Sequence, residues 1–523
     1  MLLPKRNQSQ IWIAILALAI TVLTMIPLLG LFKHLVYPPP DPYGMPLPTL
    51  IDIFKRQHIL ELLTNTLILG ISVGSCSVLL GSLFSYIEQF YEYKGKNILT
   101  LLCLLGLAIP SYISAATIGY FFDVNNSTSP FFFSILVLTL STTPYAHLCI
   151  RSALSLISSA EIQALQILGG SERQKIQTLV WPQIRSAVIF SFLISFLYSI
   201  SDFGAVATLN TPVLTWKLYE AVQYSDIYSA TVLGFTLIFC TIPLLFILNS
   251  FRESIASSVS NIRPQKPQKT TFSITCLIYI SQIVFCSLSS ILPLYQIGDW
   301  ILNGLQNNRS FPNIWDAVLG SLGISTVGGL LVVFFALFPA WSSSQYPKWK
   351  WLKQSIYLSS ALPGILLAFA LMLSGLMIGS YQILLKSGFL LFVGLSIRFV
   401  AEGFGPLYTS FSQMNTSQYD SAVMLGTPIK KWFINVLYPH LKSPLKISFV
   451  ISFLAIIKEL PIVLLLGSGL SPTLAFRIWD RYNEALFFET GIYALILLLF
   501  SGIFTWLLVL KKQEIYRICR KNC

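Results

Sequence analysis

Long apolar stretches are the feature of this sequence that most limits what it can fold into. Twelve stretches of about 20 residues or more carry few charges, and about 20 residues is the length at which an α-helix crosses a hydrocarbon core. Their apolar residues do not alternate with polar ones, which excludes a transmembrane β-barrel. The stretches lie at residues 11–36, 63–90, 98–122, 131–152, 185–209, 229–250, 271–295, 317–341, 354–380, 386–403, 445–467 and 487–510.

The composition agrees with a membrane protein. Hydrophobic residues make up 54% of the chain and charged residues 11%, whereas soluble domains carry roughly 25% charged residues. We therefore expect an all-α integral membrane protein with twelve transmembrane helices. The 4 histidines are isolated and the 8 cysteines show no CxxC spacing, so no metal site is predicted.

The basic residues predict the orientation of these helices. Alternating the connections places 25 of the 34 Lys and Arg residues on the side that holds both termini. By the positive-inside rule this side is the cytoplasm, and the long loops near 153–184 and 404–444 are cytoplasmic too. The charges are spread over short loops and form no stripe, which excludes a nucleic-acid partner.

The two halves of the chain repeat each other. Leu69-Gly70-Ile71-Ser72 recurs as Leu322-Gly323-Ile324-Ser325, and Trp181-Pro182 recurs as Tyr438-Pro439. We predict two homologous six-helix modules, residues 1–262 and 263–523, joined by a polar linker. Parallel repeats related by an axis along the membrane normal commonly enclose a transport pathway.

Each module has one long cytoplasmic loop, about 155–184 in the first and 412–441 in the second. Each loop is predicted to hold a short helix that begins at a capping-box pair and ends at a glycine. These residues are Ser158, Glu161 and Gly169 in the first loop and Ser417, Asp420 and Gly426 in the second.

The spacing of these loops resembles the EAA loop of ABC importer permeases. The triplets Gln163-Ala164-Leu165 and Asp420-Ser421-Ala422 are degenerate, but the glycine and the later proline keep the pattern. The resemblance implies that a dimer of ATP-binding subunits docks on both loops. An interfacial helix lying on lipid is the alternative. The implied coupling residues are Glu161, Ala164, Gly169 and Pro182 in the first loop and Asp420, Ala422, Gly426 and Pro439 in the second.

The chain has no GxxxxGK[ST] phosphate-binding motif, so ATP hydrolysis is expected on the partner subunit. The chain is expected to be a transport subunit and no enzyme, with no cofactor of its own.

A second pair of motifs lies in the fifth helix of each module. Asp202 in ISDFGAV and Glu459 in IKELPIV are 257 residues apart, and each is followed two residues later by a helix breaker, Gly204 or Pro461. Charged side chains are costly against lipid. We hypothesise that Asp202, Lys458, Glu459 and Pro461 line a translocation pathway. The alternative is that Lys458 and Glu459 form a structural pair that fixes the helix break.

These two motifs resemble the fused permeases of bacterial ferric-iron importers, in which Asp-Phe-Gly and Lys-Glu-Leu-Pro are typical. The chain departs from that pattern at Ile462-Val463 and at Gly467. The resemblance implies alternating access in the bacterial inner membrane, with an extracytoplasmic solute-binding protein as a further partner. A permease for thiamine or another small organic solute is the first alternative, and an ion-coupled secondary transporter is the second.

Overall fold

The protein is described here by a computed structural model. It describes residues 27–37, 49–122, 130–256, 268–269, 272–345, 353–357, 362–379, 381–414, 424, 431, 433–467, 470 and 472–521. These residues are helical except for turns and two short strands. The strands, β1 (Tyr91–Glu92) and β2 (Gln268–Lys269), pair in parallel. The all-α fold class is confirmed.

Within the described residues, 9 helices are long and apolar enough to cross a membrane, and three more are apolar but shorter. Each of these helices overlaps a different one of the twelve predicted stretches, although several begin or end about ten residues outside it. The three shorter ones are Pro27–Val36, Lys96–Leu105 and Gly364–Met377. Residues 11–26 of the first predicted stretch lie outside the described part.

The contacts divide the chain into two compact units. We call residues 45–310 with 484–492 the N-terminal unit, and residues 1–44, 311–483 and 493–523 the C-terminal unit. Helix Pro27–Val36 therefore belongs with the second half of the sequence, while the seventh apolar stretch belongs with the first half. The module boundary near residue 262 stays a prediction from the repeat.

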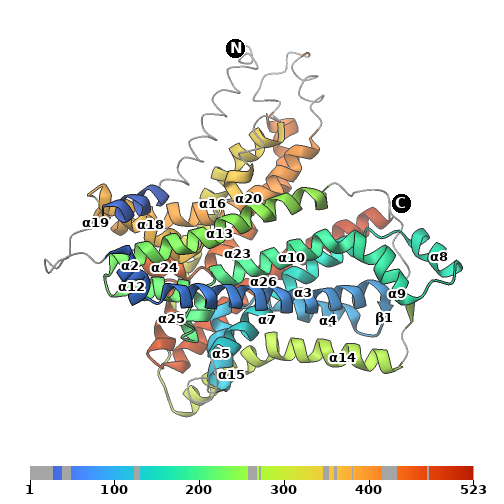
Figure 1. Ribbon diagram of the computed structural model, residues 1–523, viewed down its shortest axis with the longest axis horizontal. Coiled ribbons are helices and arrows are strands. Elements are labelled where there is room, and N and C mark those ends of the chain that lie inside the picture. The colour runs from blue at the N-terminus through green and yellow to red at the C-terminus, as the bar shows by residue number, and fades with distance from the viewer. Residues whose placement is uncertain are drawn as a thin grey trace. The chain divides into compact units, whose positions relative to one another are not determined.

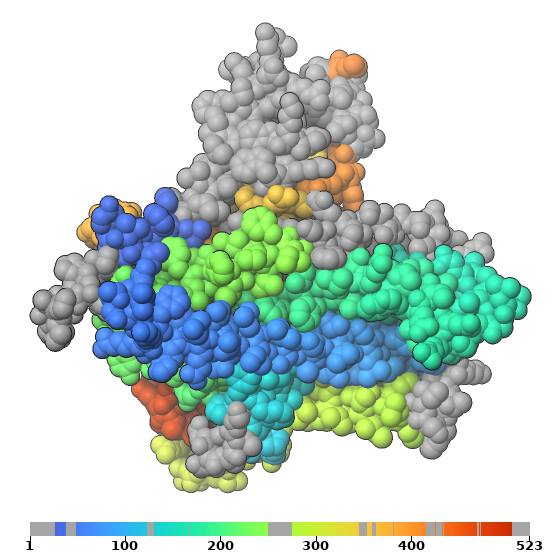
Figure 2. All heavy atoms as spheres, in the orientation of Figure 1, coloured from blue at the N-terminus to red at the C-terminus, as the bar shows by residue number. Residues whose placement is uncertain are grey.

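The N-terminal unit is built around α3, α7 and α10, which pack against one another and run as neighbours in Figure 1. In Figure 2, α3 forms a blue band on the visible face. The elements are α2 (Leu50–Arg56), α3 (Ile59–Phe90), α4 (Lys96–Leu105), α5 (Ser111–Phe121), α7 (Pro130–Leu154), α8 (Ser159–Ile167), α9 (Glu172–Gln174), η1 (Lys175–Val180), α10 (Trp181–Ser201), α11 (Gly204–Thr208), α12 (Leu214–Gln223), α13 (Ile227–Ala256), α14 (Phe272–Cys286), η2 (Ser287–Ile291) and α15 (Leu292–Gln306).

The C-terminal unit repeats this plan, with α16, α20 and α23 packed together in place of α3, α7 and α10. The elements are α16 (Trp315–Gln345), α18 (Gly364–Met377), α19 (Tyr381–Lys386), α20 (Phe389–Gln413), η4 (Phe433–Leu437), α23 (Tyr438–Ile457), α24 (Pro461–Leu466), α25 (Leu474–Asn483) and α26 (Phe487–Lys521). The two halves that repeat in sequence thus also have the same arrangement of packed helices.

The third predicted stretch is not one helix. Residues 98–122 form α4 and α5, and Pro110 between them is extended, with ψ 145°. Proline cannot donate a backbone hydrogen bond and its ring clashes with the preceding turn, so it caps a helix more readily than it continues one. Pro363 caps α18 in the same way, with ψ 135°.

The fifth helix of each unit begins with a π-helical turn. η1 leads directly into α10 at Trp181-Pro182, and η4 leads into α23 at Tyr438-Pro439. A π-turn holds one residue more than an α-turn and is often found at functional sites. Its recurrence indicates that both copies use the same geometry where the fifth helix begins.

Close packing of α3 on α7 depends on a glycine, which gives a stability prediction. A Cβ on Gly81 would lie 2.8 Å from both Ala146 Cβ and the backbone nitrogen of His147. We expect Gly81→Ala to destabilise the protein by about 1–3 kcal/mol, because overpacking displaces the helices. The measurement is the thermal midpoint in detergent, followed by tryptophan fluorescence.

The matched control is Gly298→Ala on α15, where a Cβ meets nothing within 4 Å. This variant should melt at the wild-type temperature or slightly above it, since alanine favours a helix. Equal midpoints for the two variants would contradict the packing of α3 on α7.

Candidate coupling loop and broken helices

The long loop of the first module, which is predicted to be cytoplasmic, forms the predicted helix-turn-helix. α8 ends before Gly169, which adopts a left-handed backbone with φ 73°. Ser171 then caps the next helix in a capping box, with its hydroxyl accepting from the Gln174 N–H. In Figure 1, α8 lies at the end of the α3–α10 helices, beyond most of the unit.

One face of α8 is fixed to the membrane helices. Ile162 is 1% exposed and packs in a cluster with Phe90, Ile150 and Val180. The Gln183 side chain of α10 donates a hydrogen bond of 3.0 Å to Glu161 Oε2. The loop is therefore attached at its start to the body of the unit.

Lys175 provides a second attachment, which the sequence did not reveal. Its side chain is 4% exposed, and Nζ lies 3.1 Å from Glu172 Oε2 and 4.1 Å from the Phe90 ring centroid. The Tyr86 hydroxyl donates to the same carboxylate at 3.3 Å. A desolvated cation over an aromatic face contributes about 2 kcal/mol. Because Lys175 lies 85 residues from Phe90 in sequence, no local pattern links them.

The tip of the loop is apolar and exposed. Ile167 and Leu168 are 86% and 83% exposed, and both precede the Gly169 turn. Large apolar side chains this exposed in a loop beyond the membrane helices indicate a surface that another molecule covers.

The other predicted coupling residues are placed only in part. Ala164 is exposed on α8 and Pro182 is exposed in the first turn of α10. Pro439 is exposed at the equivalent place in α23. Asp420, Ala422 and Gly426 lie outside the described residues, so the second coupling helix stays a prediction.

The helix break at Asp202 is built by hydrogen bonds to its carboxylate. α10 ends at Ser201, and Asp202 adopts an extended backbone. Oδ1 accepts the Ala205 N–H at 2.8 Å, and Oδ2 accepts the Ser111 hydroxyl at 2.6 Å. The carboxylate therefore caps α11 and joins it to the start of α5, where Pro110 separates α4 from α5.

The break at Glu459 has the same plan. α23 ends at Ile457 with Lys458 as its C-cap, and α24 starts with Pro461 in its first turn. Glu459 Oε1 accepts the Ile462 N–H at 3.4 Å. A Cβ on Gly364 would lie 2.7 Å from this oxygen. The predicted discontinuities in both fifth helices are thus present.

The two breaks differ in which of the two contacting residues has the longer side chain. The first combines the shorter acid Asp202 with Ser111, and the second combines the longer acid Glu459 with Gly364, 253 residues after Ser111. The larger acid fills the space left by the missing side chain.

Sequence reasoning missed two charged residues near the second break. An Arg398 guanidinium nitrogen donates to the Leu362 carbonyl just before Pro363. Glu402, one turn further along α20, is close enough to Arg398 and Glu459 to interact with their charges. Within the described part of the chain, Glu402 Oε2 is buried and accepts no hydrogen bond.

Glu88 of the N-terminal unit is a buried acid, 3% exposed, at the end of α3. Its Oε2 lies 3.1 Å from His147 Nε2 and 3.0 Å from an Arg151 nitrogen, and Oε1 accepts the Thr100 hydroxyl at 2.6 Å. This charge is balanced by its neighbours and holds α3, α4 and α7 together. Among the described residues, no cluster of three or more His, Cys, Asp or Glu could hold a metal ion.

Comparison with known proteins gives one family and several relatives. Residues 77–261 match the family described as binding-protein-dependent transport system inner membrane component. The Fe(3+)-transport system permease protein FbpB 2 of Haemophilus influenzae is 26% identical over 468 residues, which cover 88% of this chain and 91% of that protein.

More distant similarity covers less of the chain. The sulfate transport system permease protein CysT of Salmonella typhimurium is 22% identical over 40% of this chain and 82% of its own length. The spermidine/putrescine transport system permease protein PotC of Haemophilus influenzae is 20% identical over 33% of this chain and 68% of its own length. No solved structure matches the chain.

The exchanged side-chain lengths at the two breaks predict a double-variant effect. Gly364→Ser should lower the thermal midpoint, because its Cβ would overlap Glu459 Oε1. The double variant Gly364→Ser/Glu459→Asp should recover most of the loss, since it reproduces the Ser111 and Asp202 pair. A coupling of about 0.5–3 kcal/mol between the two sites is expected for residues in contact.

The single variant Glu459→Asp provides the control for this cycle. If the effects of the two single variants simply add in the double variant, Gly364 and Glu459 do not share one space.

Proposed function

We propose that this chain, which belongs to the binding-protein-dependent transport system inner membrane components, is the membrane subunit of an ATP-driven importer of ferric iron. The observation that carries the proposal is its similarity to the Haemophilus influenzae ferric permease over 88% of the chain. That similarity spans both units and both helix breaks. The sulfate and polyamine permeases match less than half of the chain.

The partner that supplies energy is a dimer of ATP-binding subunits docked on the two cytoplasmic loops. The exposed Ile167 and Leu168 at the end of α8 provide an apolar contact for one subunit. Docking buries these side chains, and the resulting stabilisation is about 25 cal/mol per Å² of apolar surface. The chain binds no cofactor itself, since ATP stays on the partner.

Movement of the docked subunit reaches the membrane through the attachments of the loop. The Glu172–Lys175 ion pair and the Phe90 ring join the loop to the cytoplasmic end of α3. The loop and α3 therefore move together when ATP brings the two partner subunits into contact. ATP binds the closed state more tightly, which shifts the equilibrium between the two orientations of the pathway.

The pathway passes the helix breaks that carry Asp202 and Glu459, with Lys458 and Pro461 in the second break. Carboxylate oxygens are hard ligands and suit a ferric cargo. Glu402 adds a buried carboxylate oxygen close to Glu459. Both termini lie in the cytoplasm of a bacterial cell, and an extracytoplasmic binding protein delivers iron to the outer face.

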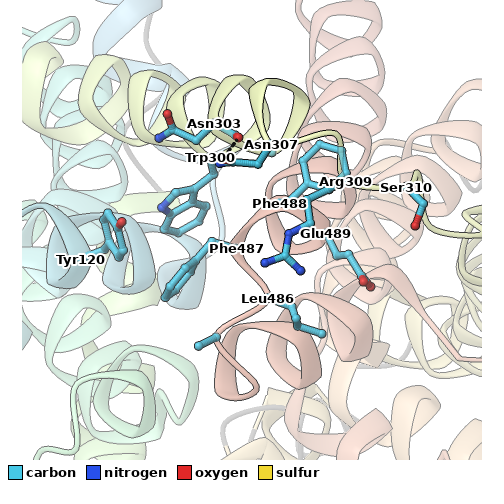
Figure 3. A pocket seen from close by; sticks show the side chains of 12 residues that line it. Tyr120, Trp300, Asn303, Asn307, Arg309, Ser310, Leu486, Phe487, Phe488 and Glu489 are labelled. Carbon is cyan, nitrogen blue, oxygen red and sulfur yellow. Dashed lines mark hydrogen bonds between the residues drawn. The ribbon is translucent and has the colours of Figure 1, made fainter.

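A small organic solute such as thiamine is the alternative substrate, and an ion-coupled secondary transporter is the alternative class. Among the described residues, an aromatic cluster at Tyr120, Trp300 and Phe487 lines a pocket with Arg309. Arg309 and Glu489 both line this pocket (Figure 3), so its charge does not favour an organic cation, and the aromatic cluster does not favour thiamine over iron.

Docking on the first loop gives a direct prediction. Leu168→Asp should abolish co-purification of the ATP-binding subunit and ATP-driven uptake of radioactive iron into proteoliposomes, because it places a charge in an apolar contact. Lys94→Asp, at an exposed side chain in the turn that follows β1, is a control that adds the same acid away from the loop. Uptake without any ATP-binding subunit would instead support the secondary transporter.

The pathway role of the acids is tested by isosteric neutralisation. Glu402→Gln and Glu459→Gln keep side-chain volume, and each should reduce iron uptake at least about tenfold with unchanged assembly, because removing a cargo ligand weakens transient binding. Measurement of ATP hydrolysis in the same proteoliposomes separates transport from folding. Wild-type uptake by the double variant would show that these acids only hold the helix break.

A further inference from the structure

The last turn of α3 makes contacts on two opposite sides. On one side, the Tyr86 hydroxyl donates to Glu172, and the Phe90 ring lies against the Lys175 ammonium group. These two contacts reach the coupling loop. Glu88 lies between them in sequence and points the other way, because two residues of an α-helix turn the chain by about 200°. In Figure 1, β1 and α9 lie at this end of α3. The turn therefore joins the loop to whatever Glu88 contacts.

Glu88 contacts α4 and α7. Its Oε1 accepts the Thr100 hydroxyl of α4 at 2.6 Å, and its Oε2 lies 3.1 Å from His147 Nε2 and 3.0 Å from an Arg151 nitrogen of α7. Lys96, at the start of α4, donates to the Glu88 carbonyl. Hydrogen bonds that involve a charged group are about twice as strong as neutral ones. We call Glu88, Thr100, His147 and Arg151 the Glu88 junction.

α4 leads from this junction to the first helix break. Thr100 lies in α4, and the backbone hydrogen bonds continue beyond the helix, where the N–H groups of Leu107 and Ala108 still donate to α4 carbonyls. Ser111 follows shortly afterwards and donates to Asp202 Oδ2 at 2.6 Å. A displacement of Thr100 is thus passed to Asp202 through a short segment that is hydrogen-bonded along most of its length.

The C-terminal unit has other residue types at the positions of the Glu88 junction. At the 253-residue shift that relates Ser111 to Gly364, Glu88 and Thr100 correspond to Trp341 and Lys353. At the 257-residue shift that relates Asp202 to Glu459, His147 and Arg151 correspond to Phe404 and Tyr408.

Helix contacts support the 257-residue shift between α7 and α20. Ala146 of α7 is the residue that a Cβ on Gly81 of α3 would meet. Gly403, 257 residues after Ala146, meets Val332 and Ala336 of α16 in the same manner. The same faces of the two helices are therefore being compared.

These four positions are also in contact in the C-terminal unit. The Phe404 and Tyr408 rings stack with centroids 5.3 Å apart, and Lys353 Nζ lies 4.9 Å from the Tyr408 ring centroid. Trp341 packs against the same cluster. A cation on an aromatic face thus replaces a hydroxyl on a carboxylate, and Lys353 precedes the segment that meets the Glu459 break. We call these four residues the aromatic junction.

We propose that α4 and the helical residues 353–357 transmit movement of the coupling loops to Asp202 and Glu459, and that the two junctions are the positioning groups that fix these segments to the moving helices. The proposal rests on the proposed function. Its basis is that the contact recurs at four matched positions although the chemistry differs. Energetic coupling between distant sites is carried by such packed and hydrogen-bonded connections between rigid elements.

A purely structural role of the junctions makes a different prediction. Loss of a structural contact lowers the amount of assembled complex, but each complex that does assemble still transports the normal amount of iron per ATP. Loss of a transmitting contact leaves ATP hydrolysis in place and lowers the iron transported per ATP. The ratio of the two rates in the same proteoliposomes therefore separates the two roles.

The first test changes the Glu88 junction in the complex with its ATP-binding subunits and iron-loaded binding protein. Thr100→Val removes one hydroxyl, and Glu88→Gln keeps the side-chain volume. Each should lower the iron transported per ATP at least about fivefold, the lower end of usual allosteric coupling. The control is Glu61→Gln at the other end of α3, where the carboxylate is 69% exposed and pairs with His58. It should leave the ratio unchanged.

The second test changes the aromatic junction. Lys353→Met removes the cation and should lower the ratio at least about fivefold, whereas Lys353→Arg keeps a cation on the Tyr408 ring and should stay within about twofold of wild type. Wild-type ratios for assembled Thr100→Val and Lys353→Met complexes would overturn the proposal. Iron uptake by the wild-type chain without ATP-binding subunits would instead reject the proposed function, so the two failures are distinguishable.

Discussion

Every interruption of a membrane helix must be satisfied by other groups of the protein, because the hydrocarbon core offers no water to a free backbone group. This constraint explains the architecture around the breaks. Asp202 accepts the Ala205 N–H, Glu459 accepts the Ile462 N–H, and Arg398 donates to the Leu362 carbonyl. The charged side chains at these breaks thus bind the backbone groups that the breaks leave free. Non-helical backbone is retained in membranes mainly where it lines a cavity or a binding site.

The coupling loop is attached firmly to its unit and still exposes an apolar contact surface. Its buried contacts, Ile162 and Lys175, face the membrane helices, while Ile167 and Leu168 face away. Lys175 is held by an aromatic ring and by a carboxylate that is itself half exposed. Burial and the charge of Glu172 also raise the pKa of the nearby Tyr91 hydroxyl, which keeps that group neutral.

Much of the fold could be predicted from the sequence because lipid imposes length and composition on each helix. The twelve apolar stretches, the repeat, the glycine turn at Gly169 and the breaks after Asp202 and Glu459 all have local signals. The break at Pro110 was missed although proline is a local signal of a helix end, because the apolar length of residues 98–122 suggested a single span. The sequence could not reveal contacts between distant residues, such as Lys175 with Phe90, Glu88 with His147, or Gly364 with Glu459. It also could not show that Gly304 and Gly491 allow the start of α26 to pack closely on α15.

The π-helical turns have a consequence for how the loop and the pathway are linked. One residue of an α-helix turns the chain by about 100°, so the extra residue in η1 fixes the rotation of everything that follows in α10. Asp202 faces its present neighbours only because that residue is there. The same holds for η4, α23 and Glu459 in the other unit. Inserting or deleting a single residue in either turn would therefore rotate the helix that follows about its own axis. Asp202 or Glu459 would then face different neighbours, although the contacts within the loop would be unchanged.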